Sequence, residues 1–144
     1  MFMEKIKVKI QRVHPDARVP IYGSAESTGF DVYSIEDKMI APGGTVMIRT
    51  GIKTEIQPGY CFLLWDRSGM GVKGIHRFAG VIDSDYRGEW KVILHNHTTG
   101  SYDVKKGDRI IQAVISYTIQ AEFEEVSDLG ETIRGEGGFH STGK

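Results

Sequence analysis

Short apolar or alternating runs, separated by turns that contain glycine and proline, recur along the whole chain. They cover residues 6–13, 45–56, 60–65, 89–96 and 109–117. In the first run, Ile6, Val8 and Ile10 alternate with lysines, which is the pattern of a strand with one buried and one solvated face. No long window has apolar residues at the i, i+3, i+4 and i+7 spacing of an amphipathic helix. We therefore predict an all-β fold, a barrel or a sandwich.

The length and charge of the chain narrow its class further. Its 144 residues, 40% of them hydrophobic, suit one globular domain. The formal net charge of -1 gives no basic footprint for nucleic acid, so we expect no nucleic-acid partner. No segment approaches the roughly 18 apolar residues of a membrane span, and the N-terminal residues lack a signal-peptide pattern. The single cysteine, Cys61, lies in an apolar run and is interpreted as a core thiol. We expect a cytoplasmic protein without a membrane partner.

The C-terminal segment differs in composition from the rest of the chain. After Phe123 it becomes acidic, and from Arg134 onward it is rich in glycine. So little apolar material cannot form a core of its own, so we divide the domain into a core at 1–126 and a mobile arm at 127–144. From Arg134 onward the arm carries an arginine, an aromatic ring and two hydroxyls, which suit a flat anionic ligand, although glycine-rich tails are more often simply disordered.

Three turn segments carry polar groups that suit chemistry. Residues 66–69 (Asp-Arg-Ser-Gly) follow an apolar strand with an arginine fork, a hydroxyl and a glycine, which suit an oxyanion, or else form an ordinary surface turn. Residues 80–88 place two carboxylates, a phenol and an arginine in one turn, where a carboxylate can activate water, although Asp and Gly are common in any turn. Residues 107–112 end in Gln112, whose amide needs a partner if it is buried.

The pair His95 and His97 would lie on the same face of a strand, a geometry that can hold a metal. No third ligand is evident nearby, and two solvated histidines are the favoured interpretation. His14 and His76 likewise offer no recognisable set of ligands.

Taken together and in this order, these segments resemble the five motifs of the trimeric dUTPase family, over essentially the whole chain. The motifs lie at residues 27–34, 67–70, 80–88, 107–112 and 134–143. The resemblance implies a jelly-roll-like β-barrel that forms a homotrimer with a flexible glycine-rich C-terminal arm. It also implies that three subunits build each active site. One supplies the first, second and fourth motifs, another the third motif, and the last the arm.

The resemblance further implies hydrolysis of dUTP to dUMP and pyrophosphate, which removes dUTP and supplies dUMP for dTTP synthesis. Asp83 is then the general base that activates a water for attack on the α-phosphorus, without a covalent intermediate. Tyr86 is the wall beneath the deoxyribose that leaves no room for a 2′-hydroxyl. Backbone groups around Gly80 are expected to recognise the edge of the uracil.

The remaining site residues implied by the resemblance bind the phosphates, the metal and the base. They are Arg67, Ser68, Gly69 and Gln112 for the phosphates, joined by Arg134, Ser141 and Thr142 of the arm, with Phe139 stacking over the base. The cofactor is Mg²⁺, held mainly by phosphate oxygens and waters. Asp31 either contacts the water shell of that metal or is a structural carboxylate.

The chain departs from the family pattern at three places. His140 follows Phe139 where the family usually has glycine, and Asp66 precedes Arg67 where many members have proline. The stretch from Arg67 to Asp83 is slightly short. Two alternatives remain at this point: a dCTP deaminase or bifunctional deaminase-diphosphatase, and a nucleotide-sensing regulatory protein of the same fold.

Overall fold

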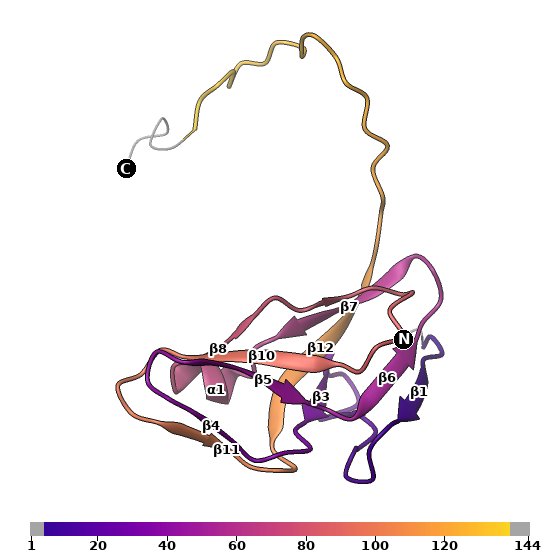
Figure 1. Ribbon diagram of the computed structural model, residues 1–144. Coiled ribbons are helices and arrows are strands. Elements are labelled where there is room, and N and C mark those ends of the chain that lie inside the picture. Colours follow the sequence, from indigo (N-terminus) through magenta and orange to yellow (C-terminus); the bar gives the residue numbers. More distant parts are fainter. Residues whose placement is uncertain (1–4, 139–144) are drawn as a thin grey trace.

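The computed structural model describes residues 5–138, and its regular secondary structure is almost entirely antiparallel strands (Figure 1). The strands are β1 (Lys9–Arg12), β2 (Ile21–Tyr22), β3 (Gly29–Tyr33), β4 (Lys38–Ile40), β5 (Thr45–Arg49), β6 (Ile52–Glu55), β7 (Tyr60–Trp65), β8 (Ile75–Phe78), β9 (Val81–Ile82), β10 (Lys91–Asn96), β11 (Tyr102–Val104) and β12 (Arg109–Tyr117). One short helix, α1 (Ser68–Val72), follows β7. The prediction of an all-β fold is confirmed.

The strands form four hydrogen-bonded sheets within the described part of the chain. The largest has the order β2-β3-β12-β7-β9, and a second has the order β5-β10-β8. The pairs β1-β6 and β11-β4 complete the set. Strands that are distant in the sequence are neighbours in space, since β12 pairs with both β3 and β7. The first and fourth sequence motifs therefore pair in the largest sheet, the second motif follows its strand β7, and the third motif contributes its edge strand β9.

Aromatic and branched side chains fill the space between the sheets. Trp90 and Phe62 are fully buried and lie edge to face, with ring centroids 4.8 Å apart. The indole Nε1 of Trp90 donates to Oγ1 of Thr54 at 3.0 Å, which satisfies the one polar atom of this ring. Cys61 is also buried, which confirms that its thiol belongs to the core.

The chain changes sheets between β8 and β9. Phe78, the last residue of β8, is opposite Ile93 of β10, whereas Val81 of β9 is opposite Leu63 of β7. The two linking residues have positive φ angles, 61° at Ala79 and 124° at Gly80. This bend separates β9 from β10 and opens a space between them.

Beyond β12 the chain extends away from the body of the molecule (Figure 1). Apolar side chains in the segment after β12 are largely exposed, including Phe123 at 94%. The boundary between the core and the arm stays a prediction. It was placed after residue 126 from composition alone. No helix within residues 5–138 has the length and apolar character to cross a membrane.

Candidate active site

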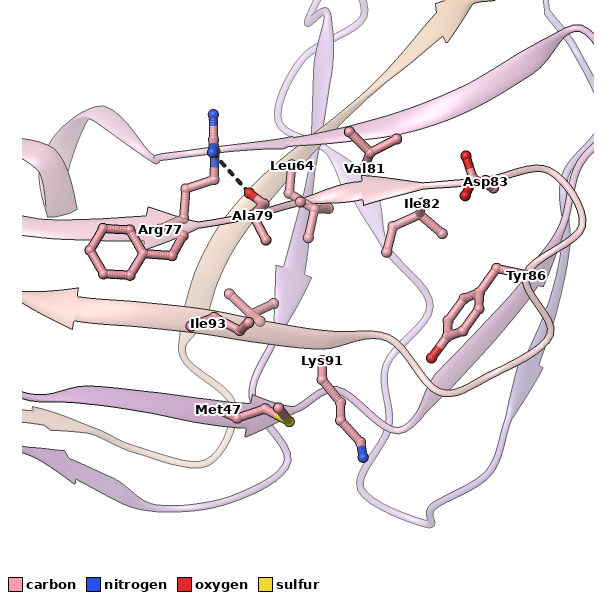
Figure 2. Close-up of a pocket in the computed structure, with 13 residues that line it drawn as sticks. Met47, Leu64, Arg77, Ala79, Val81, Ile82, Asp83, Tyr86, Lys91 and Ile93 are labelled. Carbon is pink, nitrogen blue, oxygen red and sulfur yellow. Dashed lines mark hydrogen bonds between the residues drawn. The ribbon is translucent and has the colours of Figure 1, made fainter.

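A cavity of about 420 Å³ lies between β9 and β10, where the sheet change separates the two strands (Figure 2). Its lining includes Leu64, Gly80, Asp83, Tyr86, Lys91 and Ile93. Figure 2 shows Asp83 just beyond β9 and the ring of Tyr86 directed back along the gap between the strands. We call this cavity the β9–β10 pocket.

One side of the β9–β10 pocket presents unpaired backbone. The Leu64 N–H donates to the Gly80 oxygen at 2.8 Å, and β9 is the last strand of its sheet. Because antiparallel partners alternate along a ladder, the N–H and C=O of Val81 point away from β7. A Cβ at Gly80 would lie 2.9 Å from that of Leu64, so glycine permits this close approach. The strand edge can thus offer a donor and an acceptor to a planar ligand.

Asp83 and Tyr86 share the turn that connects β9 to β10. The Tyr86 N–H donates to the Asp83 oxygen at 3.2 Å, and the Tyr86 hydroxyl donates to the backbone oxygen of Glu89 at 3.2 Å. The second bond fixes the ring along the pocket. Asp83 is exposed to solvent. Its carboxylate can therefore reach a water and accept a proton from it.

A second polar cluster lies where β3, β7 and β12 meet. The Asp31 carboxylate accepts a bond from Arg67 Nε at 2.9 Å and another from Arg109 Nη1 at 3.3 Å. Arg67 also donates from Nη1 to the backbone oxygen of Arg109 at 3.2 Å. Two guanidinium groups held side by side by one carboxylate suit a polyanionic ligand. Both oxygens of Asp31 are used in this way, and its predicted contact with a metal through water stays a prediction.

Gln112, Ser68 and Gly69 belong to the same end of the sheet. Gln112 Nε2 donates to the backbone oxygen of Asp66 at 2.8 Å, which gives the amide the partner that the sequence required. Gly29 makes room for it, because a Cβ there would lie 2.6 Å from Gln112 Oε1. Ser68 and Gly69 are exposed in the first turn of α1.

Arg109 was not predicted as a site residue. It occupies the third position of the segment at 107–112, and its charge next to a turn was the available signal. Arg109 and Asp31 are 78 positions apart in the sequence, so no local spacing of residues indicates their contact.

Asp83 and the arginine cluster lie toward opposite ends of β7. Ile82, next to Asp83, is opposite Phe62 near the start of the strand, and Arg67 is the second residue after the end of the strand at Trp65. At about 3.3 Å per residue, the two groups are separated by roughly 15–20 Å. Burial chiefly, and then the negative charge of Asp83, raises the pKa of the Cys61 thiol near the start of β7.

Comparison with known proteins decides the family. A family model described as dUTPase matches residues 16–143. The chain belongs to the dUTPase family. A deoxyuridine 5'-triphosphate nucleotidohydrolase of Nautilia profundicola is 46% identical over 142 residues, which cover 96% of this chain and 100% of the relative. One of Helicobacter hepaticus is 40% identical, over 98% of this chain and 91% of the relative. The resemblance inferred from the motifs is thereby confirmed.

The fold of this dUTPase family member agrees with a solved structure. The dUTPase of Staphylococcus bacteriophage 80alpha, in a structure with dUpNHpp, has a TM-score of 0.89 and 26% sequence identity. The match covers 96% of this chain and 99% of that one. The agreement therefore extends over nearly the whole of both molecules.

The arm and the metal complete the list of expected site features. Arg134 is exposed, and its Nε donates to the Gly137 oxygen at 2.7 Å, whereas Phe139, Ser141 and Thr142 lie outside the described residues. Within residues 5–138 no group of three or more His, Cys, Asp and Glu side chains could hold a metal ion.

Proposed function

We propose that this protein hydrolyses dUTP to dUMP and pyrophosphate. The observation that carries the proposal is the β9–β10 pocket of a dUTPase family member, with a free strand edge on one side and the Asp83 carboxylate at its mouth. Relatives up to 46% identical are deoxyuridine 5'-triphosphate nucleotidohydrolases, which supports the same substrate. The reaction would remove dUTP and supply dUMP for dTTP synthesis, in the cytoplasm.

Asp83 serves as the general base in this proposal. Its carboxylate takes a proton from a water, the oxygen of that water attacks the α-phosphorus, and pyrophosphate leaves. No enzyme nucleophile and no covalent intermediate are needed. The ring of Tyr86 lies beneath the deoxyribose and excludes a 2′-hydroxyl, while backbone groups from Gly80 to Ile82 recognise the uracil edge.

Mg²⁺ is the proposed cofactor, and the residues present fit a metal that is carried by the substrate. The described chain offers no ligand cluster of its own, and hard cations are readily held by phosphate oxygens and water. Bound there, the ion would neutralise charge on the triphosphate. Asp31 is proposed to lie at the edge of its water shell, while its carboxylate keeps Arg67 and Arg109 in place.

We also propose a homotrimer with a jelly-roll-like barrel in each subunit. The separation of roughly 15–20 Å between Asp83 and Arg67 supports this assembly, because one chain cannot apply both groups to one triphosphate. A second subunit would supply Arg67, Ser68, Gly69 and Gln112. The arm of a third would bring Arg134, Phe139, Ser141 and Thr142 over the site.

Pyrophosphate release by the purified protein with Mg²⁺ tests the function. The substrates are dUTP, dCTP, dTTP and UTP, and base deamination is followed in parallel. We expect release from dUTP and little from the other three. Deamination of dCTP would move the protein to the deaminase branch. Tight binding of dUpNHpp without turnover of any nucleotide would instead favour a nucleotide sensor.

A further inference from the structure

Asp66 is the residue just before Arg67, and its side chain joins the end of β7 to β8. Its Oδ1 accepts the backbone N–H of Arg77 at 2.8 Å, and its Oδ2 contacts Nδ1 of His76. A carboxylate only accepts, so Nδ1 of His76 carries the proton in this contact, whether the imidazole is neutral or charged. Both oxygens of Asp66 are therefore held by adjacent residues of one strand.

The backbone of Asp66 is held as well, by a third strand. Its oxygen accepts the bond from Gln112 Nε2 of β12. The next residue, Arg67, is tied to Asp31 of β3 through its own Nε. The peptide that presents Arg67 is thus fixed on both sides, by the contacts of Asp66 on one and by Asp31 on the other.

We propose that Asp66 and His76 are positioning residues, which set the place of Arg67 for binding the triphosphate. The inference rests on the proposed function. Neither residue touches the substrate. His76 orients the Asp66 carboxylate, Asp66 fixes the peptide before Arg67, and Arg67 is then aligned beside Arg109 for a polyanion.

Exposure separates this role from a general contribution to folding. The side chain of His76 is 48% exposed and that of Asp66 is 26% exposed, so the pair contributes little to overall stability. The ring of His76 also contacts Phe78 edge to face, with centroids 6.1 Å apart, and this packing limits where the imidazole can lie. Loss of the pair should consequently affect the local geometry of Arg67 more than the melting temperature.

The test compares His76→Ala with His76→Asn in the full-length protein. The Asn Nδ2 overlies the His Nδ1 position, so His76→Asn keeps a donor for Asp66 and His76→Ala removes it. We expect His76→Ala to raise KM for dUTP and Kd for dUpNHpp about tenfold. This is the effect of losing one hydrogen bond between Arg67 and a phosphate oxygen. The kcat and the Kd for deoxyuridine, which lacks phosphates, should stay near wild type. His76→Asn should restore most of the loss.

His97→Ala is the matched control, because this ring lies 6.1 Å from that of His76 and has no bond to Asp66. Equal weakening of deoxyuridine and dUpNHpp, or the same defect in His97→Ala, would show a general effect of the sheet face and overturn the inference. If His76→Ala were active and bound dUpNHpp as tightly as the wild type does, this inference alone would be overturned and the proposed function would stand. A wild-type protein that neither binds dUpNHpp nor hydrolyses dUTP would overturn the proposed function too.

Discussion

Gly88 leaves room for the phenol that forms one wall of the β9–β10 pocket. A Cβ at this position would lie 2.2 Å from the Tyr86 hydroxyl oxygen, a distance at which the ring must move. We expect Gly88→Ala to displace Tyr86 and to lower the preference for dUTP over UTP by about tenfold. The measurement is the ratio of kcat/KM for the two nucleotides. Gly100→Ala is the control, since no atom lies within 4 Å of the added Cβ, and an unchanged ratio in Gly88→Ala would contradict the role of the ring.

The carboxylate of Asp83 is the residue on which the proposed chemistry depends most directly. Asp83→Asn keeps the size of the side chain but removes the proton acceptor, so hydrolysis of dUTP should fall by about 10²–10⁴. Calorimetry with dUpNHpp should show that binding persists. Asp85→Asn, two positions along the same exposed turn, is the control and should stay active. Near-normal hydrolysis by Asp83→Asn would assign the base elsewhere.

At the residue scale, the sequence alone could not predict which side chains bond to one another when they are far apart in the chain. The motif pattern identified Asp31 and Arg67 as site residues, but their bond joins positions 36 apart and depends on β12 lying between β3 and β7. The choice between a metal contact and a structural role for Asp31 had stayed open for the same reason. The two arginine bonds now show what its carboxylate holds.

At the scale of the elements, two of the five runs were predicted with the bounds that the structure has. The runs at 60–65 and 109–117 are the strands β7 and β12, because both are rich in the aromatic and branched residues that favour strands. The run at 45–56 forms two strands, since Gly51 has a φ of 69° and separates β5 from β6. Two-residue strands such as β9 are too short for any periodicity to reveal them.

The link between β8 and β9 offers a prediction on stability. Gly80→Ala combines a φ of 124° with a contact of 2.9 Å to Leu64, and should destabilise the protein by about 1–3 kcal/mol. Ala79→Gly at a φ of 61° should have the opposite sign, by about 1 kcal/mol, because glycine tolerates this conformation. Urea denaturation of both variants provides the measurement. A stabilised Gly80→Ala would show that the sheet change does not need this backbone.

At the scale of the molecule, the proposed division of the site between subunits predicts complementation. Asp83→Asn and Arg67→Ala should each be inactive alone. If each site takes Asp83 from one chain and Arg67 from another, unfolding and refolding an equal mixture of the two variants should restore activity at about a quarter of the sites. Each of the two intact groups is then present at a site with a probability of about one half. Pyrophosphate release by the mixture is the readout. Failure to regain activity in mixed oligomers would indicate that one chain supplies both groups.

The arm offers the second prediction at this scale. Truncation after residue 133 removes Arg134 and everything beyond it, but leaves all twelve strands. Hydrolysis of dUTP should fall by at least tenfold, because phosphate contacts and exclusion of water would be lost. Light scattering after gel filtration should show an unchanged oligomer. A truncated protein with full activity would mean that the arm plays no part in closing the site.

The open edge of β9 also affects how readily the protein aggregates in concentrated solution. Unpaired strand edges attract other strands, and most proteins cover or charge them to avoid aggregation. On the proposed function this edge must stay bare, because its backbone groups would recognise the uracil. A bound nucleotide would occupy that edge as a pairing strand would. We therefore expect the protein without nucleotide to aggregate sooner during prolonged warming than the same protein with dUMP.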